Sequence, residues 1–107
     1  MKMLTRPEEL ILLAVLYLKG DAYCVPIHRR IIQVTGEKWS LGSVYMPLDR
    51  LVTKGYLTSR LSDSTPERGG RQKRIYTVTS LGIRALKKIQ EVESSMRAGL
   101  SGILEEI

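Results

Sequence analysis

The chain has little of what catalytic and metal sites usually need. Its 107 residues include one cysteine and one histidine, Cys24 and His28. A single cysteine excludes an internal disulfide framework, and these two side chains alone cannot complete a zinc site. Nucleophile-elbow and phosphate-loop motifs are missing, and no paired acid and base residues stand out. We therefore expect neither an enzyme nor a bound metal or cofactor.

Long apolar segments are missing as well. The longest apolar run, Leu10–Leu18, has nine residues, whereas a helix needs about 20 to cross a bilayer. No cleavable signal pattern follows Lys2, so we expect a cytoplasmic protein without membrane attachment. A chain of 107 residues suits one domain with one modest core.

The basic residues are concentrated in one part of the chain. The sequence has 17 basic and 11 acidic residues and a formal net charge of +6. Residues 28–74 hold ten of the basic and four of the acidic residues, and the rest of the chain has seven of each sign. A local basic excess in a small domain indicates a surface for a polyanion, usually a nucleic acid. A solubilising surface is the alternative interpretation of the charge alone.

Local signals predict the helices and strands. Thr5 and Glu8 fit a capping box at the start of an apolar helix, and Gly20 fits its end. Strand-like segments on both sides of Gly69-Gly70 predict a β-hairpin with a long basic tip. The predicted bounds are 6–18, 24–35 and 41–54 for three helices, 56–61 and 74–78 for two strands, and 80 onward for a last helix.

The start of the third helix has two interpretations. If Ser40 is the N-cap, Pro47 lies about two turns inside the helix and should kink it. If Ser43 is the N-cap, Pro47 falls at the end of the first turn, where a proline is tolerated. Both remain open at the level of sequence.

Two short helices followed by a basic hairpin predict a winged helix-turn-helix. We expect a mainly α-helical fold with a small β-hairpin. The winged helix-turn-helix domain covers residues 1–79, and residues 80–107 form a C-terminal dimerisation helix and tail.

The last helix carries an apolar stripe that continues for several turns. Such a stripe either closes the core of its own chain or pairs with a second copy, and its length favours pairing. Gly99, Ser101 and Gly102 weaken the helix, so the last residues should fray or fold back. The expected dimer contacts are Leu10, Leu13, Tyr17, Leu86, Ile89, Val92, Met96 and Leu100.

Three stretches of the sequence resemble the PadR family of transcriptional regulators, in its short type with one C-terminal helix. They are the apolar helix up to Gly20, the segment GSVYMPLDRL at residues 42–51, and the segment GGRQKRIYTVTSLG at residues 69–82. One departure is that Met46 separates Tyr45 from Pro47, where many relatives place proline directly after the tyrosine. The resemblance implies a dimer, often a repressor that releases DNA when a small hydrophobic ligand binds.

The third helix and the hairpin are the expected DNA-binding elements. An α-helix fits the major groove, where Arg50 could read guanine and Met46 could touch thymine methyl groups. Ser40, Ser43 and the free amides of the first turn suit phosphates, and Tyr45 resembles the family tyrosine that bonds a phosphate. The predicted DNA-binding residues are Ser40, Gly42, Ser43, Tyr45, Met46, Arg50, Lys54, Arg68, Arg71, Lys73 and Arg74.

The expected partners follow from this interpretation. A symmetric dimer should bind a pseudo-palindromic operator in double-stranded DNA, with half-sites about one helical turn apart. By resemblance, a small hydrophobic or aromatic effector would sit among Leu10–Leu18, Ile89, Val92 and Met96. The alternatives are a winged-helix module that binds a protein instead of DNA, which the exposed Met46 and Asp49 would suit, and an RNA binder.

Overall fold

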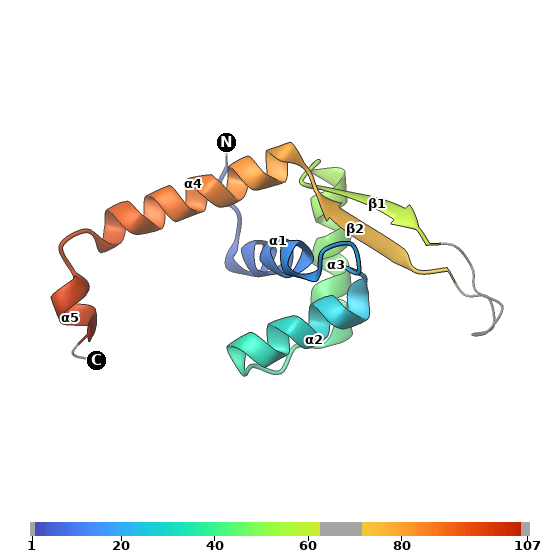
Figure 1. The fold of residues 1–107 in the computed structure, drawn as a ribbon, viewed down its shortest axis with the longest axis horizontal. Helices are drawn as coiled ribbons and strands as arrows, with labels where there is room; N and C mark the ends of the chain where they lie inside the picture. The colour runs from blue at the N-terminus through green and yellow to red at the C-terminus, as the bar shows by residue number, and fades with distance from the viewer. Residues whose placement is uncertain (1, 63–71, 106–107) are drawn as a thin grey trace.

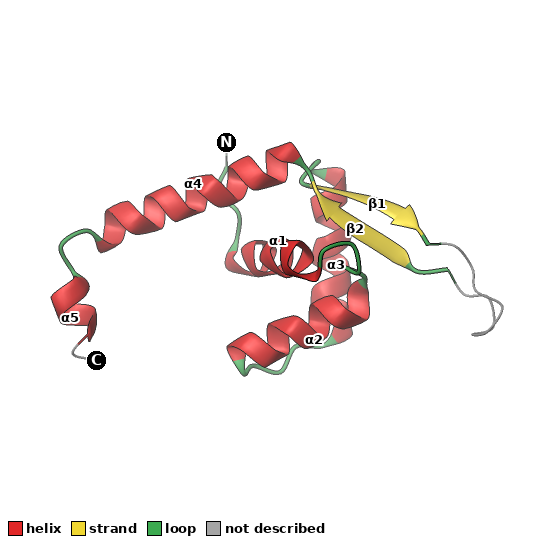
Figure 2. Ribbon diagram, in the orientation of Figure 1, coloured by secondary structure: helices red, strands yellow, loops and turns green. Residues whose placement is uncertain are grey.

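The structure, a computed structural model, describes residues 2–62 and 72–105. Three helices pack together, a hairpin projects at one end, and a long helix leaves the packed helices toward the other end (Figure 1). The predicted fold class, mainly helical with a small hairpin, is confirmed (Figure 2). The elements are α1 (Arg6–Leu18), α2 (Cys24–Thr35), α3 (Leu41–Thr53), β1 (Leu57–Leu61), β2 (Arg74–Val78), α4 (Ser80–Arg97) and α5 (Ser101–Glu105).

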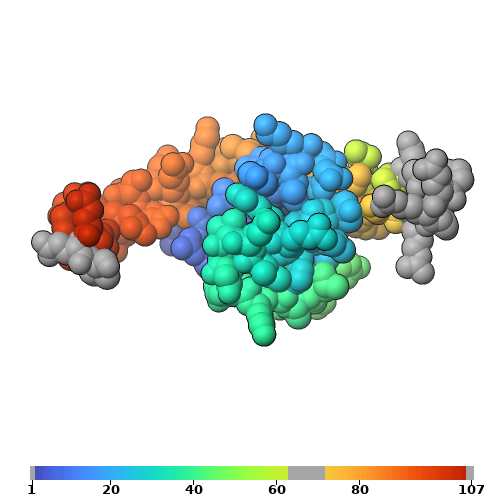
Figure 3. Space-filling model, turned by 60° about the horizontal axis from the view of Figure 1, so that its bottom comes forward, coloured from blue at the N-terminus to red at the C-terminus, as the bar shows by residue number. Residues whose placement is uncertain are grey.

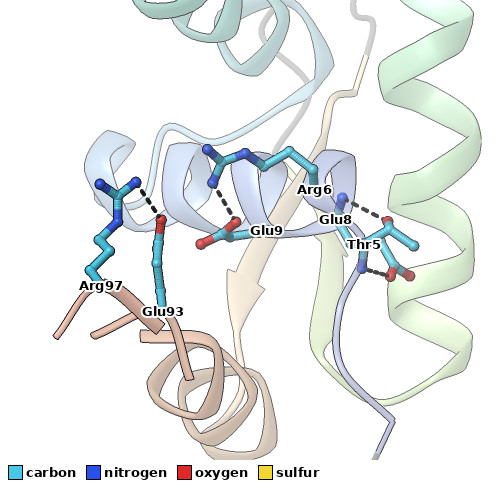
Figure 4. A network of polar contacts seen from close by, with 6 residues as sticks. All are labelled: Thr5, Arg6, Glu8, Glu9, Glu93 and Arg97. Carbon is cyan, nitrogen blue, oxygen red and sulfur yellow. Dashed lines mark hydrogen bonds and ion pairs between the residues drawn. The ribbon is translucent and has the colours of Figure 1, made fainter. Parts of the chain in front are cut away.

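The first helix begins at the predicted capping box. The Thr5 hydroxyl oxygen accepts a hydrogen bond from the Glu8 amide at 3.3 Å, and Glu8 Oε1 accepts one from the Thr5 amide at 2.8 Å (Figure 4). These two bonds satisfy amides that the helix itself leaves without partners. At the other end, Lys19 and Gly20 both take positive φ angles, and the helix stops.

The third helix begins at Ser40. The Ser40 side chain accepts a hydrogen bond from the Ser43 amide at 3.1 Å, so Ser43 lies inside the helix rather than at its cap. Pro47 is therefore an interior residue of α3, and it is buried against the core. The helix continues past this proline to Thr53.

One apolar core joins these elements. Each of the three packed helices buries one apolar face in this core. Burial of each large apolar side chain stabilises the fold by about 1.5–3 kcal/mol relative to leaving it in water. Part of α4 packs on the same core through Ala85, Leu86 and Ile89. The largest fully buried side chains are Ile11, Leu12, Ile27, Val44, Leu48, Leu51 and Leu57.

The hairpin is attached to the helices by hydrogen bonds. Strands β1 and β2 run antiparallel, with Leu57 opposite Val78 and Leu61 opposite Arg74. The Tyr76 amide also donates to the Ala22 carbonyl at 2.8 Å, which ties β2 to the connector before α2. This bond fixes the direction in which the hairpin leaves the core.

The start of α4 is held against the turn before β1. Thr79 caps the helix by accepting a hydrogen bond from the Gly82 amide at 3.1 Å. Its hydroxyl donates to the Gly55 carbonyl at 2.6 Å, and its amide donates to the Tyr56 carbonyl at 3.0 Å. Gly82 is buried at this contact, so α4 approaches the Gly55–Tyr56 backbone closely.

The second half of α4 is largely exposed. Beyond Ile89, exposure rises along the stripe until Met96 is 74% exposed. The chain turns at Gly99, whose φ is 80°, and then forms the short helix α5 over Ser101–Glu105. Within residues 2–62 and 72–105, none of the helices combines the length and apolar character needed to cross a membrane.

An ion pair between a buried carboxylate and a half-exposed lysine joins α1 to the end of α3. Glu8 is only 5% exposed, and its Oε2 lies 2.7 Å from Lys54 Nζ. Burial by itself would raise the pKa of Glu8, but hydrogen bonds from Lys54 and Thr5 outweigh it. The pKa of the Glu8 carboxyl is therefore lowered from its ordinary value of 4.5. Folding consequently favours the charged form of Glu8.

The Glu8–Lys54 pair should make stability depend on acidity. Because the folded pKa is lowered, the stabilisation is complete above pH 4.5 and is lost as the pH falls through the lower, folded pKa. Lys54→Met keeps the aliphatic stem but leaves the buried carboxylate without its cation. We expect it to reduce the free energy of unfolding by about 1 kcal/mol at pH 7, a modest value because Lys54 is half exposed.

Urea unfolding at pH 7 and at a series of lower pH values checks this expectation. The gap in stability between the native chain and Lys54→Met should close as the pH falls through the lowered, folded pKa of Glu8 and the carboxyl becomes protonated in both. Arg97→Met is the matched control, because it breaks the exposed Arg97–Glu93 pair and should change little at any of these pH values. A gap that stays constant with pH would contradict the role of Glu8.

Candidate nucleic-acid interface

The outward face of α3 presents most of the predicted DNA-binding residues. Ser40, Gly42, Ser43, Tyr45, Met46 and Arg50 are all exposed. The two serine hydroxyls lie 2.9 Å apart at the start of the helix, next to amides of its first turn. A helix start of this kind offers donors and a positive dipole end to an anion. The face combines hydroxyls, a phenol, a thioether and a guanidinium.

Arg50 is available on this face. Its guanidinium makes no ion pair with any residue in the described ranges, and the side chain is exposed. Together with Lys38, Trp39 and Met46 it lines an open hollow of about 470 Å³ between the start of α1 and α3. Met46 is itself 59% exposed, so the residue that departs from the family pattern points outward.

Lys54 has a partner that the sequence reasoning missed. Its ammonium is bound to the buried carboxylate of Glu8, 46 positions earlier in the chain. The side chain remains half exposed, but its charge is already balanced within the fold. Among the predicted DNA-binding residues, Lys54 therefore has a clear structural role.

The described part of the hairpin holds its cations in place. Lys73 Nζ lies 4.2 Å from the ring centroid of Tyr23 and donates to the Tyr23 hydroxyl at 3.2 Å. Arg74 donates to the Ser59 hydroxyl at 3.1 Å across the two strands. These contacts hold Lys73 beside Tyr23, which precedes α2, and Arg74 on the surface of the hairpin. Arg68 and Arg71, the other two predicted cations, lie outside the described residues.

His28 and Cys24 are partly buried side chains with structural surroundings. His28 Nε2 donates to the Trp39 carbonyl, which ties α2 to the link before α3. Trp39 is half buried and packs against the core. Burial raises the pKa of the Cys24 thiol, so the reactive thiolate is disfavoured there. Within residues 2–62 and 72–105, no three metal-binding side chains come together.

Apolar side chains also remain exposed on α1 and α4. Leu13 and Tyr17 are exposed on the outer side of α1, where the Arg30 guanidinium lies 3.6 Å from the Tyr17 ring centroid. The predicted dimer residues divide by burial: Leu10, Leu86, Ile89 and Val92 are half buried, and Leu13, Tyr17, Met96 and Leu100 are exposed. The start of α1, the residues before it and the outer half of α4 line a second, shallow and mostly apolar depression of about 310 Å³, which is open to solvent.

Packed helices, an outward third helix and a basic hairpin define a winged helix-turn-helix protein of the DNA-binding transcription regulators. The chain belongs to the PadR-like family of transcriptional regulators, whose sequence profile matches residues 12–88. That match runs from the middle of α1 to the middle of α4 and includes the whole outward face of α3. The predicted family is therefore confirmed. The comparison with curated protein sequences gave no match.

Several solved structures share the fold. A PadR family transcription regulator from hypervirulent Clostridium difficile R20291 has a TM-score of 0.72 and 23% identity, covering 94% of this chain and 99% of that one. The complex structure of hsRosR-S1 has a TM-score of 0.67 and 27% identity, covering 96% and 84%. The Aeropyrum pernix ORC1 protein in complex with DNA has a TM-score of 0.62 and 23% identity, covering 79% of this chain and 24% of that protein.

Proposed function

We propose that the chain is a sequence-specific repressor that binds double-stranded DNA as a cytoplasmic homodimer. Residues 1–79 bind DNA, and residues 80–107 hold the two copies together. The observation that carries the proposal is the outward face of α3, where Arg50 is exposed and no described residue forms an ion pair with it. The structurally similar ORC1 protein was solved in complex with DNA, and the proposal extends DNA binding to this chain.

Each part of the face has a distinct task in this proposal. Arg50 donates two hydrogen bonds to a guanine edge in the major groove, and Met46 packs against thymine methyl groups. Ser43, Tyr45 and the amides at the start of α3 bond phosphates and set the register of the helix on the duplex. Sequence is read by the base contacts, and most of the affinity comes from the phosphate contacts.

The hairpin cations should contribute to affinity without reading sequence. Replacing Lys73 and Arg74 together with alanine should weaken binding to every duplex sequence. It should also lower the slope of log affinity against log salt by about two, which is about one for each lost phosphate contact. Titrations at several salt concentrations measure this slope. Lys87→Ala with Lys88→Ala on the exposed side of α4 removes the same charge and should leave the slope nearly unchanged.

The operator and the dimer are tested together. Selection from random duplex DNA with the purified protein should return a pseudo-palindrome with half-sites about one helical turn apart. Light scattering should show two copies in solution. Recovery of no preferred sequence, with binding to an acidic protein instead, would favour a winged-helix module for protein partners.

An effector is proposed at the depression between the start of α1 and α4. Ile89, Val92 and Met96, three of the predicted effector residues, line it together with Met3 and Leu4. A small hydrophobic or aromatic compound bound there would release DNA only if it favours a spacing of the two copies that does not fit the operator. Thermal-shift screening followed by operator-release assays tests this, and binders that never release DNA would indicate a constitutive repressor.

A further inference from the structure

A groove between α1 and α2 has an apolar floor and a cationic edge. It encloses about 250 Å³ and is lined mainly by Leu10, Leu13, Tyr17, Ile31 and Val34. Tyr17 is 59% exposed and Val34 is 62% exposed, so large apolar surface faces outward here. The Arg30 guanidinium, which lies over the Tyr17 ring, supplies the charge at the edge. Exposed apolar surface rimmed by charge is typical of a protein interaction site.

The C-terminal helix α5 and Leu100, the residue before it, present an exposed apolar face. Leu100, Ile103 and Leu104 are 40–60% exposed and lie three and four positions apart, which places them on one side of a helix. None of the five residues of α5 is buried. A helix this short is not stable on its own in water, so its apolar side needs a surface to cover it.

We propose that α5 of a second copy docks in the α1–α2 groove, with Leu100, Ile103 and Leu104 on the apolar floor. The charges are complementary: α2 contains Arg29 and Arg30 and no acidic residue, whereas α5 ends at Glu105. Glu105 then lies toward Arg30 at the edge of the groove.

The position of α5 along the chain explains why the occupant comes from the other copy. Figures 1 and 3 both show α5 at the far end of α4, away from α1 and α2 of its own chain. Pairing of the α4 stripes, which belongs to the proposed function, carries that far end onto the partner. Each copy then closes the groove of the other, and the two contacts are equivalent by symmetry.

Cysteine cross-linking tests the contact directly. In a Cys24→Ala chain, Val34→Cys and Ile103→Cys place one thiol in the groove and one on α5. Mild oxidation should give a covalent dimer on a non-reducing gel, and each single cysteine variant should not. A matched pair, Lys88→Cys with Ile103→Cys, uses the exposed side of α4 and should stay uncross-linked.

The other outcomes separate this inference from the proposed dimer. A fast-moving monomer band would show that α5 folds onto its own chain, which overturns the inference. A dimer by light scattering without any cross-link would overturn the inference and leave the proposed function intact. A monomer at all concentrations would overturn both.

Dimer dissociation provides an independent measurement. Ile103→Ser with Leu104→Ser should raise the dissociation constant of the dimer about tenfold or more, because two apolar contacts are lost in each groove. Gly102→Ser, on the same short helix, should leave it unchanged, since position 102 lies on the opposite side of the helix from Leu100, Ile103 and Leu104. Arg30→Glu should weaken the dimer and Glu105→Arg should restore it, whereas loss without rescue would contradict the pairing of these two charges.

Discussion

A Gly82→Ala variant should lose about 2 kcal/mol or more of its free energy of unfolding. A Cβ at Gly82 would lie 2.5 Å from the Tyr56 carbonyl oxygen and 2.7 Å from Val78 Cγ1. The carbonyl is backbone and already accepts a hydrogen bond from the Thr79 amide, so it cannot move without breaking the start of α4. Overpacking of this kind costs about 1–3 kcal/mol or more, and the gain in helix propensity returns at most about 1 kcal/mol.

Thermal and urea unfolding measure this loss. For a domain of this size, each 1 kcal/mol corresponds to a fall of about 4–8 °C in Tm. Gly102→Ala is the control, because its Cβ would meet nothing within 4 Å and α5 contributes no buried residue. We expect its stability to be unchanged or slightly higher. Equal stability of the two variants would mean that the approach of α4 to the Gly55–Tyr56 turn is not tight.

The predicted helix and strand bounds were accurate where the signals are local. Thr5 and Glu8 lie three positions apart and cap each other, so residues 5–8 are enough to place the start of α1. Helix α2 and strand β2 also match their predicted bounds. The N-cap of α3 could not be chosen, since both Ser40 and Ser43 are good caps and a proline two turns inside a helix is costly without being excluded. In the structure Ser40 is the N-cap, and Pro47 is buried inside the helix.

Contacts between residues far apart in the chain could not be predicted from the sequence. Lys54 was predicted as a DNA contact, but its ammonium binds Glu8, which is 46 positions away in the sequence. Lys73 and Tyr23 are 50 positions apart. Charge and periodicity predict which side chains are cationic or exposed. Which of these side chains contact each other depends on how the helices pack. Gly82 belongs to the segment that resembles the PadR family, but the resemblance does not say why a glycine stands there. In the structure, a Cβ at this position would collide with the backbone carbonyl of Tyr56.

Replacing Arg50 with alanine should remove most of the sequence preference of the dimer. Each half-site would lose its hydrogen bonds to guanine, which cost about 1–3 kcal/mol, and a symmetric dimer loses them twice. Affinity for the selected operator should therefore fall by one to four orders of magnitude. Affinity for random duplex DNA should fall much less, because only one charge per copy is removed.

Arg50→Lys distinguishes base recognition by Arg50 from its electrostatic contribution to DNA affinity. Lysine keeps the positive charge but lacks the flat pair of donors that fits a guanine edge, so it should retain random-sequence affinity and lose part of the operator preference. Titrations of both variants against the operator and a scrambled duplex, at one salt concentration, give the two ratios. If Arg50→Ala weakens both duplexes by the same factor and Arg50→Lys weakens neither, Arg50 holds a phosphate. Specificity would then have to come from Met46 or from DNA shape, since a phosphate contact carries no base information.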